Sequence, residues 1–207
     1  TPTMGGILIL MAILVSTLLW ADILNRFILI VVFSTIWLGV TGFMDDYIKQ
    51  SRKKSKGLTA TAKFTSQILL GLIVGTFLLL NPETSTRLEI PFLKDVAINL
   101  GVFYILFVIL VIAGSSNAVN LTDGLDGLAI GNVIMVACAF SVLAYVSGNI
   151  KFSNYLLIPY IKGSGELTVF CASMLGAGLG FLWFNCHPAS IFMGDVGSLA
   201  LGGALGI

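Results

Sequence analysis

Long apolar stretches dominate this sequence and restrict the folds open to it more than any other feature does. An α-helix needs about 20 predominantly apolar residues, with a range of about 17–25, to cross the hydrocarbon core of a bilayer. Six stretches have this length, and a seventh begins at Val196; the six cover residues 4–21, 27–44, 64–80, 96–113, 128–145 and 167–184. The chain is 57% hydrophobic and only 10% charged, whereas soluble domains carry about 25% charged residues. These features predict an all-α, polytopic transmembrane helical bundle with six full helices and the start of a seventh, forming a single domain over residues 1–207.

The connections between these stretches alternate between two faces of the predicted bundle. The first face holds residues 1–3, 45–59, 114–127 and 185–195, and the second holds residues 22–26, 81–95 and 146–166. Lys and Arg concentrate in cytoplasmic loops, and the densest group of them lies on the first face: Lys49, Arg52, Lys53, Lys54 and Lys56. We therefore predict that the first face is cytoplasmic. On the second face, the sequence RLEIPFLKDV at 87–96 predicts a short hairpin, and no basic domain that would bind nucleic acid is present.

Five of the ten acidic residues lie on the first face, close to the predicted helix ends: Asp45, Asp46, Asp123, Asp126 and Asp195. Charged groups at membrane depth are costly and indicate function by default. Asp126 and Asp195 each precede a predicted helix, so either could instead cap its backbone N–H groups. Asp45 and Asp46 follow a helix expected to end near Met44, where the helix dipole disfavours carboxylates. They therefore require a cation, which Lys49 or a metal ion could supply.

Two segments on the first face combine glycine with Asn and Asp: SSNAVNLTDGLDGLAIG at 115–131 and NCHPASIFMGDVGSLALGG at 185–203. Oxygen donors without paired His or Cys suit Mg²⁺, and helix N-termini beside glycine suit anions. Together with the lysines, these segments favour a site for a metal-bound diphosphate. Phe192, three residues before Asp195, is placed to stack on a nucleobase.

Acidic residues in membranes also mark ion pathways, so a cation or proton transporter is the alternative from a different functional class. Transporters bind their ions near the bilayer midplane, often at broken helices. Because the five acids lie on one predicted face, the sequence favours an enzyme.

Five motifs carry a resemblance that runs the whole length of the chain. They are TPTMGG at 1–6, DDYIK at 45–49, KGLTATAKF at 56–64, NAVNLTDGLDGLA at 117–129 and NCHPASIFMGDVGSLALGG at 185–203. In them the chain resembles the phospho-N-acetylmuramoyl-pentapeptide transferases of the polyprenyl-phosphate sugar-1-phosphate transferase superfamily. PTMGG and GDVGSLALGG favour this branch over the UDP-N-acetylglucosamine polyprenyl-phosphate GlcNAc-1-phosphate transferases, which are the alternative enzyme.

The resemblance implies an enzyme of the bacterial inner membrane with its active site on the cytoplasmic face. Its substrates would be UDP-N-acetylmuramoyl-pentapeptide and undecaprenyl phosphate, its products lipid I and UMP, its cofactor Mg²⁺ and its usual state a homodimer. Family members have about ten transmembrane helices, each of the usual spanning length. We therefore expect this chain to be part of a longer protein, with the first helices before position 1 and a histidine-rich cytoplasmic loop beyond position 207. The chain alone is not expected to hold every part of the active enzyme.

By motif position, the resemblance also assigns roles to individual residues. It implies that Asp195 is a Mg²⁺ ligand, that Asn120 is a neutral oxygen ligand, and that Asp45 and Asp46 form the essential acid pair. The implied uridine-binding residues are Asp123, Gly124, Leu125, Asp126 and Phe192. The further implied active-site residues are Thr3, Lys49, Lys63 and Asn185.

Overall fold

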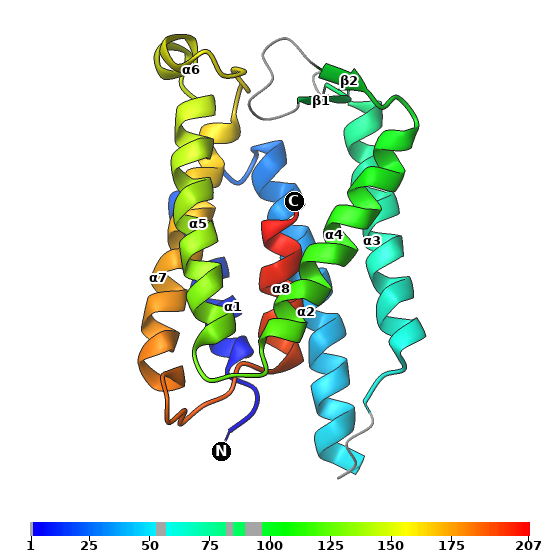
Figure 1. Cartoon of the computed structure of the whole chain (residues 1–207), viewed down its shortest axis with the longest axis vertical. Coiled ribbons are helices and arrows are strands. Elements are labelled where there is room, and N and C mark those ends of the chain that lie inside the picture. Colours follow the sequence, from blue (N-terminus) through cyan, green and yellow to red (C-terminus); the bar gives the residue numbers. More distant parts are fainter. Residues whose placement is uncertain (1, 53–56, 82–84, 90–96) are drawn as a thin grey trace.

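The computed structural model describes residues 2–52, 57–81, 85–89 and 97–207. Within them the chain is a helical bundle with one small hairpin at one end (Figure 1). The elements are α1 (Gly6–Trp20), α2 (Arg26–Arg52), α3 (Ala60–Leu80), β1 (Arg87–Glu89), β2 (Ala97–Asn99), α4 (Phe103–Thr122), α5 (Leu128–Ser147), α6 (Ile150–Leu156), a 3₁₀ turn (Ser164–Glu166), α7 (Leu167–Asn185) and α8 (Gly194–Leu205). The predicted all-α class is confirmed.

Five of the described helices are long and apolar enough to cross a membrane, namely α2, α3, α4, α5 and α7. The chain is therefore a multi-pass membrane protein. The predicted count of six full spans was one too high, because α1 is apolar but only 15 residues long. The seventh predicted helix is α8, which begins at Gly194.

The predicted helix at 96–113 is shifted towards the C-terminus in the structure. Its first residues instead form β2, which pairs antiparallel with β1 so that Leu88 lies opposite Ile98. The described strands confirm the predicted hairpin, whose residues 90–96 lie outside the described part of the chain. At its other end, α4 continues to Thr122 and takes in most of the predicted loop 114–127. Polar side chains near this end, such as Ser116 and Asn120, find partners on α8, so the helix does not have to end where the apolar stretch ends.

Helix α2 also runs further than the sequence predicts, to Arg52 instead of Met44. Asp45 and Asp46 therefore lie inside a helix, and the unfavourable dipole expected at its end does not act on them. The prediction failed because it equated the end of the apolar stretch with the end of the helix.

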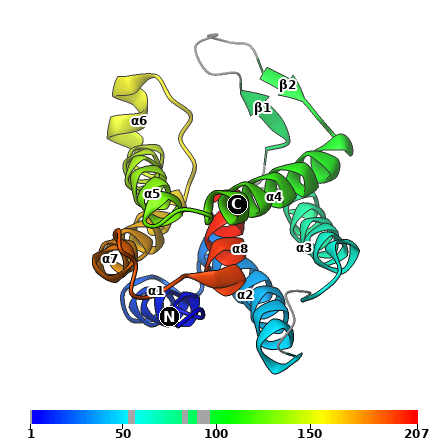
Figure 2. The same cartoon turned by 60° about the horizontal axis from the view of Figure 1, so that its bottom comes forward.

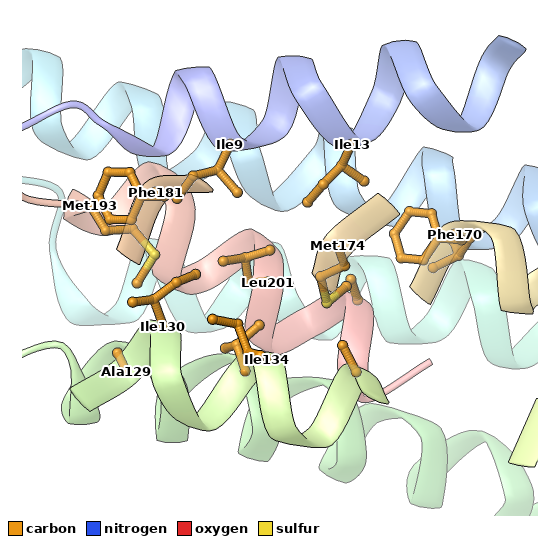
Figure 3. Packing of buried hydrophobic residues seen from close by; sticks show 14 of the residues in the cluster. Ile9, Ile13, Ala129, Ile130, Ile134, Phe170, Met174, Phe181, Met193 and Leu201 are labelled. Atoms are coloured by element: carbon orange, nitrogen blue, oxygen red, sulfur yellow. The ribbon is translucent and has the colours of Figure 1, made fainter. Parts of the chain in front are cut away.

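Helix α8 lies at the centre of the bundle. Figure 2 shows it enclosed by α1, α2, α4 and α5, and every residue from Val196 to Ala204 is buried. One core cluster joins α8 to α1, α5 and α7 through Leu201, Ile9, Ile130 and Met174 (Figure 3). A second cluster joins it to α2, α3 and α4. The helix that carries Asp195 is therefore held on all sides.

Glycines bring the backbones of neighbouring helices into contact with α8. A Cβ atom added to Gly42 of α2 would lie 2.2 Å from the Asp195 carbonyl oxygen. One added to Gly6 of α1 would lie 2.2 Å from the Gly197 nitrogen, and one added to Gly202 would lie 2.5 Å from the Ser115 carbonyl oxygen of α4. Small residues at helix interfaces are the usual means of close packing in membranes.

The described connections confirm the predicted alternation of faces. The N-terminus, the α4–α5 connection, the α7–α8 connection and the C-terminal end of α2 lie at one end of the bundle (Figure 1). Helix α6 and the hairpin lie at the other end. Lys53, Lys54 and Lys56, on which the predicted orientation rests, lie outside the described residues.

We expect Gly42→Ala to destabilise the protein by about 1–3 kcal/mol, the usual cost of overpacking, because its methyl group would push α2 away from α8. The matched control is Gly176→Ala in α7, where an added Cβ meets no atom within 4 Å. Thermal unfolding in detergent should show a lower melting temperature for Gly42→Ala only. Equal melting temperatures for both variants would contradict this account of the α2–α8 contact.

Candidate active site

Three carboxylates from two helices meet at the end of the bundle that carries the N-terminus. Asp45 and Asp46 come from α2, and Asp195 comes from the first turn of α8. One oxygen of each lies within 4.8 Å of the others. The Asp45 side chain is fully buried, and those of Asp46 and Asp195 are only 10% and 16% exposed. Such a group of acids repels itself unless cations are close.

Two lysines supply positive charge to this acid–lysine cluster, which consists of Asp45, Asp46, Asp195, Lys49 and Lys63. The Lys49 ammonium group pairs with Asp45 and lies 3.1 Å from Asp195 Oδ2 and 3.7 Å from Asp46 Oδ1. Lys63, from α3, lies 3.0 Å from Asp45 Oδ2 and also pairs with Asp195. Of the two cations that the sequence left open for the Asp45–Asp46 pair, Lys49 lies in contact with it, and the metal ion remains a prediction. Three carboxylates against two ammonium groups leave one formal negative charge.

Side chains from α2 and α4 fix the position of Asp195. The Val196 N–H donates to Asp46 Oδ2 at 3.1 Å, so a carboxylate of α2 accepts from the first turn of α8. The Asn120 amide nitrogen donates to Asp195 Oδ1 at 3.0 Å and to Ser198 Oγ at 2.8 Å. Asp195 lies within α8 rather than at its N-cap, which is Met193. The capping hypothesis for Asp195 was therefore wrong.

The environment of Asp195 favours its ionised form. Burial by itself would raise its pKa, but hydrogen bonds from Lys63 and Asn120 and the charge of Lys63 outweigh it and hold the pKa well below the usual range. The carboxylate is therefore available to a cation.

The segment before α3 closes around Asp45. The Leu58 N–H donates to Asp45 Oδ1 at 2.6 Å. A Cβ added to Gly57 would lie 2.3 Å from the same oxygen, so only glycine fits against the carboxylate. Asp45 is therefore immobilised by α2, α3 and the segment between them.

The N-terminal segment pairs with the α7–α8 connection beside this cluster. The Phe192 N–H donates to the Pro2 carbonyl at 2.9 Å, and the Gly5 N–H donates to the Phe192 carbonyl at 2.9 Å. Gly194 has φ 75°, and a Cβ there would lie 2.4 Å from the Thr3 carbonyl oxygen and 2.6 Å from Asp46 Oδ2. The structure therefore brings the Thr3 backbone to the cluster. The Phe192 ring is 38% exposed, which leaves it accessible to a ligand.

Asp123 ends α4 next to the same cluster. Burial, together with repulsion from the Asp195 and Asp46 carboxylates, raises its pKa to about 6, although a hydrogen bond from the Gly194 backbone acts in the opposite direction. Its charge is thus coupled to that of the cluster.

Asp126 and Asn185 tie the two motif loops together. Asp126 Oδ2 accepts from the Ala189 N–H at 3.1 Å and lies 3.2 Å from His187 Nδ1. Gly127, without a side-chain cap, precedes α5, so the capping hypothesis for Asp126 was also wrong. Asn185 is buried, accepts from the Gly127 N–H at 3.1 Å and donates to the Ile191 carbonyl at 2.8 Å. Their contacts hold the loops in place, and the predicted uridine-binding role of Asp126 remains a prediction.

Gly124 and Leu125, which lie between Asp123 and Asp126, are exposed in the α4–α5 connection. The structure places them at the same end of the bundle as the cluster (Figure 1). Their predicted contact with uridine also remains a prediction.

Sequence reasoning missed Ser198 and Gly57. Ser198 accepts from Asn120 and donates to the Gly194 carbonyl at 3.0 Å. Its position three residues after Asp195, on the same face of a helix, was the signal that could have identified it. Gly57 offered no comparable signal, because its role depends on the path of the chain around Asp45.

The donor set of the cluster fits a hard divalent cation. All candidate ligands are oxygens, one from each of Asp45, Asp46 and Asp195, which is the ligand type that Mg²⁺ prefers. The residual negative charge of the cluster also favours the binding of a cation. Asn120 contacts Asp195 through its amide nitrogen, so its amide oxygen is the atom that can act as a neutral ligand.

Comparison with known proteins identifies a family and a curated relative. Residues 28–207 match the family described as "Glycosyl transferase family 4". A phospho-N-acetylmuramoyl-pentapeptide-transferase of Desulfotalea psychrophila is 56% identical over 205 residues, which cover 99% of this chain. The chain spans 57% of the length of that relative.

We expect Asp123 to make the stability of the metal-free protein depend on pH. Its folded-state pKa of about 6 lies above the ordinary value of 3.8 for an aspartate in the unfolded chain. Its contribution to stability is therefore complete below pH 3.8 and is lost as the pH rises through 6. Asp123→Asn should abolish this loss, and its melting temperature should rise relative to that of the original protein across the same window. Thermal unfolding with a chelator present measures both. Parallel pH curves would show that Asp123 does not titrate in this way.

Proposed function

The chain belongs to glycosyl transferase family 4, and on that basis we propose that it transfers phospho-N-acetylmuramoyl-pentapeptide from its UDP-linked donor to undecaprenyl phosphate. The products would be lipid I and UMP. The acid–lysine cluster at one end of a membrane-spanning bundle is the observation that carries the proposal. The 56% identical relative bears the name of this activity, and the motifs of the sequence favour the same branch.

The reaction requires an oxygen of the carrier phosphate to attack the phosphorus that bears the sugar. The bond between the two phosphates of the donor breaks, and UMP leaves with the bonding electrons. Both reactants are anions, so catalysis depends on positioning and charge neutralisation. In our proposal Lys49 and Lys63 provide positive charge beside the phosphates. Asp45 and Asp46 hold these lysines and the start of α8 in place.

Mg²⁺ would be held by Asp195, with Asn120 as a neutral ligand and the Asp45–Asp46 pair close by. When bound, it would neutralise charge on the diphosphate. The low pKa of Asp195 supports this role, because the carboxylate needs no deprotonation before it binds a cation.

Uridine would bind beside the cluster, against the exposed ring of Phe192 and the loop formed by Asp123, Gly124, Leu125 and Asp126. Base–aromatic stacking contributes about 1–3 kcal/mol. Asn185 would act on this site indirectly, since both ends of its side chain hold the loops. Thr3 would contribute through its position beside Gly194.

We place the cluster at the cytoplasmic side of the bacterial inner membrane, in a protein that forms a homodimer as the family resemblance implies. The UDP-linked donor is water-soluble and the carrier is a lipid, so a site at the end of a bundle can meet both. The same position argues against a transporter, whose acids are expected near the midplane.

The proposal is tested by transfer of a radiolabelled sugar phosphate to polyprenyl phosphate by the purified full-length protein that contains this chain, with Mg²⁺. UDP-N-acetylmuramoyl-pentapeptide should act as donor and UDP-N-acetylglucosamine should not. Asp195→Asn should lower the rate by about 10²-fold or more, as the loss of one charge-stabilising group commonly does. Because Asp195 also pairs with Lys49 and Lys63, the melting temperature of the variant is measured alongside to confirm that it is folded. Transfer from UDP-N-acetylglucosamine alone would assign the other enzyme class, and transfer from neither donor would contradict both.

Asp45 is expected to position its neighbours and not to act as a general base. A phosphate monoester has a second pKa near 6, so the acceptor is already mostly a dianion at neutral pH. Removing its last proton would contribute far less than the roughly 10²–10⁴-fold of general base catalysis. The complete burial of Asp45 and its pairing with Lys49 and Lys63 support this reading.

The pH–rate profile of Asp45→Asn distinguishes the two roles. A positioning role predicts a large loss of rate that persists near pH 9, where a phosphate whose second pKa is near 6 needs no base. If alkaline pH restores most of the lost rate, Asp45 is the base. The same profile of the original protein is the control for effects of pH on the lysines.

A further inference from the structure

A second distinctive surface lies at the opposite end of the bundle from the cluster. We call residues 150–161, which comprise α6 and the turn after it, the α6 segment. Seven of its large apolar side chains are exposed by 44% to 83%, namely Ile150, Phe152, Tyr155, Leu156, Leu157, Tyr160 and Ile161. Such a concentration of exposed apolar side chains requires a partner or an apolar environment.

The backbone of the α6 segment and of its flanks is firmly held by the bundle. The Asn149 side chain caps α6, and the Ile161 N–H donates to the Ser147 carbonyl at 2.9 Å. Just beyond the segment, the Asn25 amide donates to the Gly163 carbonyl at 2.9 Å. A Cβ on Gly148 would lie 2.4 Å from the Gly165 nitrogen, so the two backbones are in contact. The fold therefore presents these apolar side chains outwards from a fixed backbone.

The helix α6 has two outward faces of different character. Phe152, Tyr155 and Leu156 stand at i, i+3 and i+4, which places them on one face. Lys151 and Asn154, at i and i+3, stand together on another face. Ser153 packs inwards and is fully buried. Figure 1 shows α6 lying across the end of α5 and not in line with it. This is the arrangement of a helix that lies in the plane of a membrane surface.

The neighbouring spans fix where this segment stands relative to a bilayer. Helix α5 ends at Ser147, and α7 begins at Leu167. Both qualify as membrane spans, so the residues that join them start and finish at the edge of the hydrocarbon core. Tyrosines are enriched at this depth, where the ring meets acyl chains and the hydroxyl meets water.

We propose that the α6 segment is an interfacial anchor that inserts its Phe152–Tyr155–Leu156 face into the lipid leaflet far from the acid–lysine cluster. Lys151 and Lys162 would contact lipid phosphates, since lysine extends its charge from apolar surroundings to the headgroups. A cavity of about 700 Å³ beside the segment is lined by Tyr160 and Lys162 and also by Arg26 and Arg87. These cations favour anionic headgroups.

Lipid fits this surface better than a second copy of the chain does. Stable interfaces bury about 800 Å² on each partner, whereas α6 is only a seven-residue helix and its exposed residues include Lys151 and Asn154. The inference does not depend on the reaction assigned to the chain.

Depth measurement by spin labelling tests the proposal in the protein reconstituted in nanodiscs of phosphatidylcholine and phosphatidylglycerol. The free cysteines Cys138, Cys171 and Cys186 would be replaced by alanine, and single labels placed through Tyr155→Cys, Leu156→Cys or Asn154→Cys. The first two labels should collide more with oxygen than with a water-soluble nickel chelate and lie about 5–10 Å below the phosphates. The Asn154→Cys label, the matched control on the polar face, should show the reverse preference.

Two results would overturn the proposal. Equal access of the nickel chelate to all three labels would place the segment in water. Protection of the Tyr155→Cys and Leu156→Cys labels from both reagents, with spin–spin broadening between copies, would show that a second copy covers the surface. Because the two labels are separate variants, failure of one to fold leaves the other to decide.

Discussion

The contact between α2 and α8 is the interaction on which the candidate site depends. Gly42 lets the α2 backbone touch the start of α8, and three residues further along α2 the carboxylates begin. Asp46 then accepts from the Val196 N–H, which locks the register of the two helices. Without this approach Asp195 could not share its lysines with Asp45. Helix α8, which is short and packed through glycines at the centre of the bundle, therefore fixes the position of Asp195. A loop could not do so, because it would not be held by packing on every side.

Charge is the second constraint. Three nearly buried carboxylates at the edge of a membrane are unfavourable unless each finds a cation or a donor. The chain meets this demand from three separate elements: Lys49 on α2, Lys63 on α3 and the Asn120 amide on α4. The same ion pairs therefore join the helices of the bundle and assemble the site, so stability and chemistry rest on the same atoms. Because Asn120 donates to Asp195, the polar residues near the end of α4 have partners within the bundle, and the helix continues to Thr122.

Hydrophobicity alone was sufficient to predict the helical class of the fold and the alternation of its connections between the two ends of the bundle. It also predicted that the acids gather at one of these ends. It was insufficient for helix ends, because a helix continues through polar residues when other helices satisfy them, as at Asp45 in α2 and Asn120 in α4. The motifs identified the residues of the cluster, since chemistry restricts residue type. They did not separate residues that face the cluster from those, such as Asn185 and Asp126, that hold loops together. That distinction depends on long-range contacts, for example between Asn185 and Gly127, which no local pattern encodes.

The present arrangement of the lysines also bears on how substrates would enter under the proposed function. Lys49 and Lys63 are 35% and 20% exposed, whereas Asp45, which pairs with both, is fully buried. The lysines therefore form the outer layer of the cluster and the carboxylates the inner one. A diphosphate bound with a divalent cation would bring negative charge to the lysines and positive charge to the carboxylates. Each layer would then exchange one ionic partner for another. Such an exchange lets the site compensate all but one of its negative charges when empty and still bind a highly charged substrate.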